Sequence, residues 1–343
     1  MDIVKIKGDR SESQILIGES YRNIEKYLPH SNVFIITDSN LMQLYGEEMP
    51  EHPIFSIEPG EQSKSLEVVS QICSWLLTNG ADRKSFVLGF GGGVVCDIAG
   101  FVASVYMRGV EFGFVSTSLL SQIDASVGGK NGVDLDGYKN IIGTFNQPKF
   151  VLCDTEMLRT LPAIELSNGL AEMVKHALIA NKEKFEIMEN SVSELLAYNE
   201  NILESLISQS VRIKADIVAA DERESGERKK LNLGHTWGHA VEKVTGLPHG
   251  QSVSIGLEFA ALLSVSKGLL KNDDYLRIMN LLTSLQLPIN AEVSPLLIFQ
   301  VLVKDKKRVS ESIDFVLLNG IGSVTVERLA IKEIEEFYKS VYA

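Results

Sequence analysis

Residues 85–104 constrain the fold of this chain more than any other segment. They begin with SFVLGF, a short apolar run typical of a buried parallel strand, and continue with Gly91, Gly92 and Gly93. The next residues, VVCDIAGFVAS, have apolar positions at helical spacing. A strand, a glycine turn and a helix start in this order predict an α/β domain whose helix N-terminus binds a nucleotide diphosphate. The glycines do not follow GxGxxG, so a standard Rossmann fingerprint is absent.

Four other short apolar runs support the α/β prediction, at residues 32–37, 54–57, 109–117 and 150–154. The first ends in Asp38, which either caps a helix or binds a ribose hydroxyl. Residues 119–125 are predicted to be helical. Residues 126–148 are rich in Gly and Asp and predict a long loop, and a loop of this length in a compact domain is more often functional than structural filler.

After Asp154 the pattern changes to long helical periodicity, with one strand predicted at residues 313–318 and a basic turn, VKDKKRV, at 303–309. We therefore predict an α/β nucleotide-binding domain at residues 1–154 and a mostly α-helical domain at residues 155–343. A helix predicted at 167–180, with a capping start at Ser167, carries Glu172, Lys175 and His176 on one face. Such a group is usually structural, but Glu172 is the carboxylate best placed to complete a metal site.

Three of the six histidines lie in LNLGHTWGHAVEKVTGLPHG, residues 231–250. His235 and His239 are four residues apart, so a helix presents both rings on one face. Gly234 predicts the start of that helix and Gly246 its end, which leaves His249 just beyond. Two helical histidines and a third after the break predict a divalent metal site, and the alternative is a set of structural histidines.

Composition limits the kind of partner. The formal net charge of −12 argues against nucleic-acid binding through overall charge, although a local basic pocket is compatible with it. Three scattered cysteines without a CxxC pair indicate a reducing compartment. The N-terminus lacks the apolar core of a signal peptide, and no apolar run is long enough to span a membrane. These features predict a soluble cytoplasmic protein.

Several segments together resemble one family. They are, in chain order, GGGVVCDIAGF, STSLLSQIDASVGGKNGVD, GYKNIIGTF, NGLAEMVKHALI, ADERESGERKKLNLGHTWGHAVE and LPHG. These segments are similar to those of the 3-dehydroquinate synthases, and the resemblance extends from about residue 38 to about residue 320. It implies an NAD-binding α/β domain, a mostly helical domain, an active site between them, a catalytic Zn²⁺ or Co²⁺ ion and a homodimer.

The resemblance also implies roles for individual residues. It makes Glu172, His235 and His249 the metal ligands, whereas His239 becomes an active-site residue instead of a ligand. The implied substrate-pocket and catalytic residues are Arg108, Asp124, Lys130, Lys139, Asn140, Lys175, Lys214, Arg228, Asn232, His239 and Lys306. The implied NAD contacts are Asp38, Asn40, Glu61, Lys64, Gly92, Gly93, Val94, Asp97, Thr117, Ser118, Lys130, Lys139 and Thr160. Two positions depart from the family pattern, Gln251 in place of a common Glu and Ser118 in place of a common Thr.

The activity implied by the resemblance is conversion of 3-deoxy-D-arabino-heptulosonate 7-phosphate to 3-dehydroquinate and phosphate, a step of the shikimate pathway to chorismate and the aromatic amino acids. The expected course is transient oxidation by NAD, phosphate elimination, reduction and intramolecular aldol closure, with Asp124 and His239 moving protons. Two other enzymes are compatible with the motifs, namely another sugar-phosphate cyclase and a metal-dependent polyol dehydrogenase. A non-catalytic nucleotide-binding module would leave the metal triad and the pocket cations unexplained.

Overall fold

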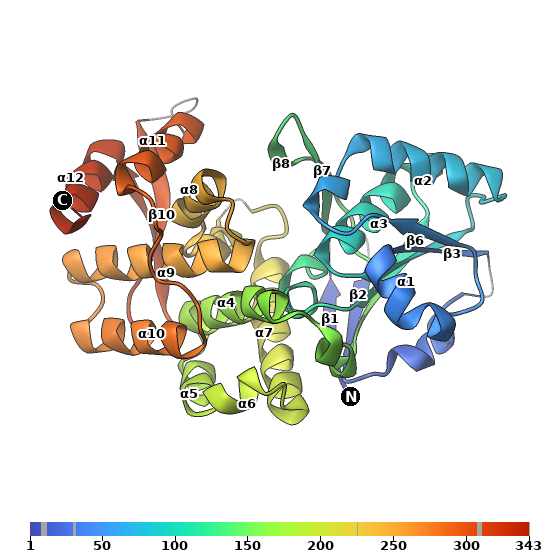
Figure 1. Ribbon diagram of the computed structural model, residues 1–343, viewed down its shortest axis with the longest axis horizontal. Coiled ribbons are helices and arrows are strands. Elements are labelled where there is room, and N and C mark those ends of the chain that lie inside the picture. Colours follow the sequence, from blue (N-terminus) through green and yellow to red (C-terminus); the bar gives the residue numbers. More distant parts are fainter. Residues whose placement is uncertain (8–11, 30–31, 225, 307–310, 343) are drawn as a thin grey trace. The chain divides into compact units, whose positions relative to one another are not determined.

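The computed structural model describes residues 1–7, 12–29, 32–224, 226–306 and 311–342. Its contacts divide the chain into two compact units (Figure 1). The first unit comprises Met1–Leu161 and Leu203–Arg223, and the second comprises Pro162–Ile202 and Glu224–Ala343. The segment Leu203–Arg223 therefore packs with the N-terminal part of the chain, although it follows residues of the second unit in the sequence.

The first unit is built on a seven-stranded sheet in the order β1-β2-β9-β6-β5-β3-β4. The strands are β1 (Asp2–Lys7), β2 (Glu12–Ile17), β3 (Val33–Asp38), β4 (Ile54–Ile57), β5 (Phe86–Gly91), β6 (Glu111–Ser116) and β9 (Phe150–Cys153). Only β1 and β2 pair antiparallel, and the remaining pairs are parallel. Every residue of β5 is buried, as expected for a central parallel strand covered on both faces. Leu16, Ile35, Leu88, Val115 and Leu152, from five strands, lie in one core cluster.

Three helices connect the parallel strands of this sheet and place their N-termini at its carboxyl edge. They are α1 (Ser39–Tyr45), α2 (Leu66–Thr78) and α3 (Gly93–Val105). Helix α3 follows β5 directly, so the glycine turn that the sequence indicated is the β5–α3 connection. After β6 the chain forms a short π-helix at Ser121–Ala125, within the segment predicted to be helical.

The loop predicted at residues 126–148 is wrong over most of its length. Strands β7 (Lys130–Leu135) and β8 (Tyr138–Phe145) form an antiparallel hairpin, in which Leu135 is opposite Tyr138. Asp136 and Gly137 form the two-residue turn, with φ of 51° and 76°. Both values are positive, as the tight turns that suit hairpins require. The Asp and Gly residues that suggested a loop are thus turn residues of a hairpin.

The second unit is mostly helical. Its helices are α4 (Ala163–Ala180), α5 (Lys182–Asn190), α6 (Val192–Leu196), α8 (His235–Thr245), α9 (His249–Ser266), α10 (Asn272–Ser284), α11 (Pro295–Lys306) and α12 (Ile331–Tyr342). Helix α4 begins after Pro162 instead of at the predicted Ser167. The predicted single strand is β10 (Ser312–Leu318), which pairs with an unpredicted strand, β11 (Val324–Ala330). Residues 303–306 of the predicted basic turn are helical, and residues 307–310 lie outside the described part.

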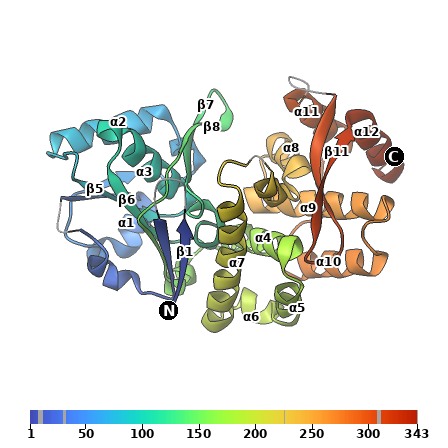
Figure 2. The ribbon, with the colours of Figure 1, turned by 180° about the vertical axis from the view of Figure 1, so that it is seen from behind.

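Helix α7 (Glu200–Ala220) is held against the N-terminal strand of the first unit. Figure 2 shows α7 beside β1, and the Arg212 guanidinium lies 2.6 Å from the Asp2 carboxylate. The Ser208 hydroxyl donates a hydrogen bond to the same carboxylate. These contacts explain why α7 belongs to the first unit in space.

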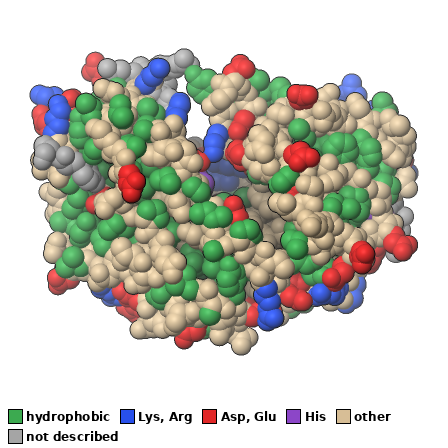
Figure 3. Space-filling model, viewed as in Figure 1, with side chains coloured by type: hydrophobic (Ala, Val, Ile, Leu, Met, Phe, Trp, Pro, Cys, Tyr) green, Lys and Arg blue, Asp and Glu red, His purple; other side chains and the backbone are tan. Residues whose placement is uncertain are grey.

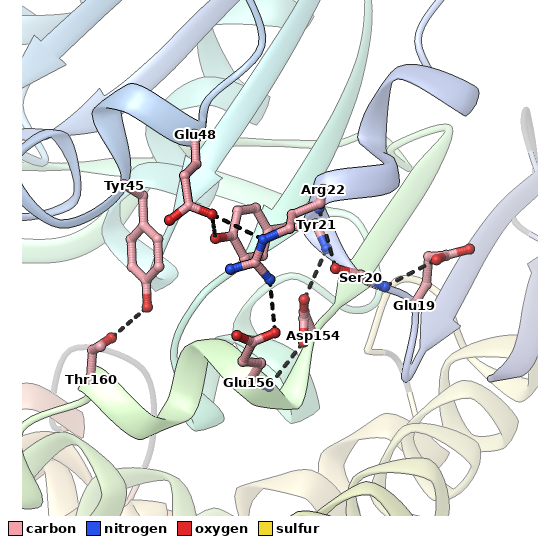
Figure 4. Close-up of polar contacts among 9 residues, drawn as sticks. All are labelled: Glu19, Ser20, Tyr21, Arg22, Tyr45, Glu48, Asp154, Glu156 and Thr160. Carbon is pink, nitrogen blue, oxygen red and sulfur yellow. Dashed lines mark hydrogen bonds and ion pairs between the residues drawn. The ribbon is translucent and has the colours of Figure 1, made fainter.

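A polar cluster fastens three short 3₁₀ segments of the first unit together, at Tyr21–Lys26, Gly46–Glu48 and Thr155–Thr160 (Figure 4). The Arg22 guanidinium is 3.0 Å from the Glu48 carboxylate and 2.8 Å from the Glu156 carboxylate. The buried Asp154 carboxylate accepts hydrogen bonds from the backbone N–H groups of Tyr21 and Glu156. Asp154 thus fixes the chain where it leaves β9.

Acidic, basic and hydrophobic side chains are interspersed on the face shown in Figure 3 and do not form one large charged patch there. None of the helices in the described part is long and apolar enough to cross a membrane.

Candidate functional site

The β5–α3 turn forms a narrow cradle at the carboxyl edge of the sheet. Gly92 is the N-cap of α3 and Gly93 its first residue, and no side chain caps this helix end. A Cβ atom on Gly93 would lie 3.1 Å from Ala125 Cβ, and one on Gly92 would lie 3.4 Å from Ser118 Oγ. Side chains at these positions would fill the space in front of the helix N-terminus. The backbone can therefore come close to an anion there, which fits the diphosphate of a dinucleotide.

A lysine and an aspartate lie beside this cradle and form an ion pair in which the lysine is buried and the aspartate side chain is 17% exposed. Lys64 Nζ is 2.7 Å from Asp97 Oδ2 and donates to Asn140 Oδ1 at 2.6 Å. Burial raises the pKa of Asp97 to about 6, although the Lys64 charge opposes the shift. Burial alone would lower the pKa of Lys64, but Asp97 and Glu61 together raise it above its ordinary value. The lysine therefore stays protonated within reach of an anion.

Hairpin β7–β8 is connected to this ion pair. Asn140 lies on β8, and its backbone N–H donates to the Asp134 carboxylate at 2.7 Å. Lys139 Nζ is 3.8 Å from Glu61 Oε1, and Lys64 Nζ is 3.7 Å from the same oxygen. The structure thus brings together five of the predicted residues, Glu61, Lys64, Asp97, Lys139 and Asn140, from segments distant in the sequence.

The other predicted cofactor residues are spread along the carboxyl edge of the sheet. Asp38 caps α1 by accepting the Leu41 N–H at 3.1 Å, and burial raises the pKa of its carboxyl group. Asn40 is exposed in the same helix. Val94 follows the glycine cradle, and Thr117 and Ser118 are buried after β6. The Thr160 hydroxyl shares a 2.7 Å hydrogen bond with the Tyr45 hydroxyl (Figure 4).

Predicted substrate residues of the first unit include a second buried lysine. Lys214, on α7, forms an ion pair with the Asp124 carboxylate and donates to the Asp124 backbone carbonyl at 2.6 Å. Asp124 belongs to the π-helix. Arg108 is exposed and has a φ of 72°, and Lys130 is exposed at the start of β7. The cations of this unit therefore differ in burial, from the enclosed Lys214 to the accessible Arg108.

Three residues of the second unit meet as a candidate metal centre. Glu172 on α4, His235 at the start of α8 and His249 at the start of α9 offer ligand atoms that all lie within 4.8 Å of one another. Glu172 Oε1 is 3.6 Å from His235 Nε2 and 3.5 Å from His249 Nε2. Two ligand atoms on a tetrahedral zinc lie about 3.3 Å apart when each is about 2.0–2.1 Å from the ion. The three side chains are therefore spaced as ligands of one ion.

The Glu172 carboxylate provides the clearest test of fit for a metal ion. The residue is completely buried, and its Oε1 atom, which faces both histidine Nε2 atoms, has no hydrogen-bond donor that meets the usual geometry among the described residues. The Lys175 ammonium forms an ion pair with it. Lys175 reaches Oε2, and a buried carboxylate oxygen such as Oε1 is costly to leave without a partner of its own. Two imidazoles that bind through Nε2 and a carboxylate are ligands that zinc or cobalt accepts, so the residues fit a divalent ion.

Electrostatics keep the carboxylate of this centre ionised. Burial would raise the pKa of Glu172, but Lys175 and His249 outweigh it and lower the value to about 2. Burial would lower the pKa of His249, and the Glu172 and Glu242 carboxylates instead raise it to about 9. Burial, followed by the Lys175 charge, lowers the pKa of His235 well below its usual range.

The remaining predicted residues of the second unit lie on or near the segment that leads into α8. Arg228 is buried in the 3₁₀ segment Glu227–Asn232, and Asn232 donates to Glu224 Oε1 at 2.7 Å. His239 is exposed one turn after His235, and their ring centroids are 5.1 Å apart. Lys306 ends α11, and its side chain lies outside the described part.

Sequence reasoning missed two residues that hold the metal-centre helices. Glu242 Oε2 is 3.5 Å from His249 Nδ1. The Asn168 side-chain oxygen accepts the Gly250 N–H at 3.0 Å, which fastens the start of α9 to α4. Glu242 could have been found, because it lies seven residues after His235 and so shares its helix face. No local pattern pointed to Asn168, since its partner is distant in the sequence.

The family of this chain follows from comparisons with known proteins. The sequence model of the 3-dehydroquinate synthase N-terminal family matches residues 54–168. The sequence model of the C-terminal family matches residues 169–308. The chain belongs to the 3-dehydroquinate synthase family. A 3-dehydroquinate synthase of Thermoanaerobacter pseudethanolicus is 40% identical over 328 residues, which is 92% of each chain.

Solved structures of related cyclases share the whole fold with this member of the 3-dehydroquinate synthase family. A 2-deoxy-scyllo-inosose synthase, solved with carbaglucose-6-phosphate, NAD⁺ and Co²⁺, superposes with a TM-score of 0.88 at 24% identity, covering 99% of this chain and 100% of that one. A 2-epi-5-epi-valiolone synthase from Streptomyces hygroscopicus, solved with NAD⁺ and Zn²⁺, gives a TM-score of 0.87 at 25% identity, covering 99% of both chains. The predicted fold class, an α/β domain followed by a mostly helical domain, is confirmed.

Proposed function

We propose that this chain converts 3-deoxy-D-arabino-heptulosonate 7-phosphate to 3-dehydroquinate and phosphate, using NAD⁺ and one Zn²⁺ or Co²⁺ ion. The observation that carries the proposal is the buried Glu172 carboxylate, which faces two histidine Nε2 atoms at 3.5 and 3.6 Å in a chain of this family. The inosose and valiolone synthases that share the fold were solved with NAD⁺ and Co²⁺ or Zn²⁺. The reaction would supply the shikimate pathway to chorismate and the aromatic amino acids.

The residues of the second unit would hold the metal and part of the substrate. Glu172, His235 and His249 are the proposed ligands, and Lys175 keeps Glu172 ionised. Arg228 and Asn232 supply donors for substrate oxygens, with the planar guanidinium suited to a carboxylate or phosphate. His239 is exposed beside the ligands and would transfer protons with substrate hydroxyls. When bound, the metal would act as a Lewis acid toward vicinal hydroxyls of the substrate, and NAD⁺ would be a reversible hydride acceptor.

The residues of the first unit would hold the dinucleotide and balance the charge of the substrate. The amides at Gly92 and Gly93 would face the diphosphate, and Lys64 would remain protonated beside it. Arg108, Lys130 and Lys139 would neutralise a substrate that carries both a carboxylate and a phosphate. The Asp124 carboxylate, paired with Lys214, would move protons during elimination and ring closure, and the substrate phosphate can serve as its own base. The homodimer remains a prediction from the family resemblance, and the cytoplasmic location remains a prediction from the composition.

A phosphate-release assay tests this function. The purified chain should release phosphate from 3-deoxy-D-arabino-heptulosonate 7-phosphate with NAD⁺ and Zn²⁺, and a chelator should abolish release until metal is added back. NADH absorbance should not accumulate, because the cofactor is regenerated in each turnover. The absence of chelator-sensitive turnover would contradict the assignment. A His249→Ala variant should lose bound metal but keep its circular dichroism spectrum, and unchanged metal content would show that the ligand set is wrong.

The same assay separates the two alternative enzymes. A polyol dehydrogenase would form NADH in proportion to substrate oxidised and would release no phosphate. A cyclase of the inosose or valiolone type would turn over sugar phosphates that lack a carboxylate, such as glucose 6-phosphate, faster than the carboxylated substrate. The cations Arg108, Lys130, Lys139, Lys175 and Arg228 favour the carboxylated substrate, which carries one more negative group than those sugar phosphates.

A further inference from the structure

His249 lies between two carboxylates, and only one of them is a proposed metal ligand. Its Nε2 atom is 3.5 Å from Glu172 Oε1, and its Nδ1 atom is 3.5 Å from Glu242 Oε2. We propose that Glu242 is a positioning residue of the metal centre, which accepts the Nδ1–H of His249 and thereby presents the Nε2 lone pair to the metal. The inference rests on the proposed metal centre and extends it beyond its three ligands.

The other histidine ligand has the same arrangement. His235 Nε2 is 3.6 Å from Glu172 Oε1, while His235 Nδ1 lies 3.1 Å from the backbone carbonyl oxygen of Leu233. Each ring therefore turns Nε2 toward Glu172 and Nδ1 toward an oxygen acceptor. A neutral imidazole has one N–H, and an acceptor at Nδ1 places that proton there and leaves Nε2 free to bind a metal. The repetition in both rings indicates that Glu242 serves His249 as the Leu233 carbonyl serves His235.

Helix α8 carries Glu242 in the required position. Glu242 is seven residues after His235 and three after His239, so all three project from one side of the helix. The helix ends at Thr245, and after Gly246, Leu247 and Pro248 the chain turns into α9, which begins with His249. The rings of His235 and His249 have centroids 5.3 Å apart. One helix thus provides a metal ligand and the partner of another ligand.

The Leu233 carbonyl is neutral, whereas the Glu242 carboxylate is charged, and this difference gives Glu242 a further effect on metal binding. A backbone carbonyl orients a ring, whereas a carboxylate also makes the imidazole a stronger donor and offsets part of the charge of the ion. The Glu242 side chain is 13% exposed, so solvent weakens this effect only in part. Loss of such an outer partner typically weakens metal binding by about 10–100-fold.

Zinc affinity, measured by competition with a chromophoric chelator, tests the inference in three full-length variants. Glu242→Gln keeps the shape and one acceptor oxygen but removes the charge, and Glu242→Leu removes both. We expect the dissociation constant of zinc to rise about 10-fold or more in Glu242→Gln and further in Glu242→Leu, with one zinc per chain at saturation in both. The control is Glu258→Gln on α9, a buried glutamate that contacts Tyr275, which should bind zinc as the unchanged protein does.

The cobalt spectrum adds a readout that a purely structural role would not move. The visible bands of the Co²⁺-loaded Glu242→Gln protein should shift, because the donor strength of His249 falls, while unfolding of the metal-free protein stays unchanged. Unchanged zinc affinity and unchanged cobalt bands in Glu242→Gln would overturn the inference. A fall from two bound zinc ions to one would also overturn it, because His239, Glu242 and His249 would then hold a second ion. If the unchanged protein binds no zinc, the proposed metal centre itself fails.

Discussion

At the scale of single residues, the second unit buries a charge that the proposed reaction does not use. Lys184 on α5 is completely buried, and burial lowers its pKa well below the usual range for lysine. Between its folded and unfolded pKa values the unfolded chain binds more protons than the folded chain, so the free energy of unfolding rises with pH. Lys184 therefore destabilises the folded protein at neutral pH. This destabilisation disappears as the pH rises toward the pKa that the lysine has in the unfolded chain.

Replacing this lysine with an apolar side chain of similar length should stabilise the protein. We expect Lys184→Met to raise the free energy of unfolding at pH 7 by about 1 kcal/mol or more, because the cost of burying an ammonium group often exceeds what its contacts return. The gain should shrink as the pH rises toward 10. Urea unfolding followed by circular dichroism at several pH values measures both effects. Lys182→Met, whose side chain is 62% exposed, should change stability by less than about 0.5 kcal/mol. A less stable Lys184→Met variant would show that the contacts of the Lys184 side chain outweigh the cost of burying it.

At the scale of elements, the metal centre depends on how closely α8 and α9 approach. A Cβ atom on Gly256 would lie 1.8 Å from the Gly234 carbonyl oxygen, and one on Gly238 would lie 2.8 Å from the Ser252 carbonyl oxygen. Gly234 is the N-cap of α8 and immediately precedes His235. The absence of side chains at this crossing therefore sets the position of a proposed metal ligand.

A methyl group at the crossing should disturb both stability and metal binding. An alanine in a helix gains up to about 1 kcal/mol over glycine, whereas overpacking costs about 1–3 kcal/mol. The clash in Gly256→Ala is with backbone, which cannot move aside, so we expect a net loss of stability and weaker zinc binding.

Thermal unfolding measures the stability of Gly256→Ala, and chelator competition measures its zinc affinity. Gly46→Ala is the matched control, since its Cβ would meet only the end of Met42 at 3.3 Å. Normal zinc affinity in Gly256→Ala would argue against this coupling.

The sequence predicted these elements unevenly, for physical reasons. Helix α8 was predicted with its boundaries, because Gly234 and Gly246 mark where it starts and stops. Hairpin β7–β8 was missed, since the Asp and Gly of its turn are equally frequent in loops. Strand β11 was missed because its pairing with β10 is a tertiary contact. The spacing of His235 and His239 indicated a metal site in this segment, whereas the meeting of Glu172, His235 and His249 from three different helices required either a family resemblance or a structure.

At the scale of the whole molecule, contacts between distant parts of the chain decide which segments belong together. Helix α7 joins the first unit through Asp2, which is 210 residues before Arg212. Helical periodicity predicts α7 but cannot predict this partner, because the pattern contains only local spacing. The fold class was therefore accessible from the sequence, while the path of the chain between the units was not.

The Asp2 contacts should stabilise the protein with a defined pH dependence. A hydrogen bond from Ser208, and then the contacts with Arg212, lower the pKa of Asp2 below its ordinary value of 3.8. A depressed carboxyl pKa stabilises the folded state above the unfolded pKa, and the contribution disappears as the pH falls through the folded pKa. Asp2→Asn should thus lower the free energy of unfolding at pH 7 by up to about 1 kcal/mol, since the pair is partly exposed and screened. The difference in unfolding free energy between Asp2→Asn and the unchanged protein should disappear below pH 3.8.

Urea unfolding at pH 7 and at lower pH measures this difference. The control is Asp216→Asn, an exposed position on α7, which makes the same change of charge. Equal losses in both variants would assign the effect to net charge, whereas a loss confined to Asp2→Asn places it in the link between the first strand and α7.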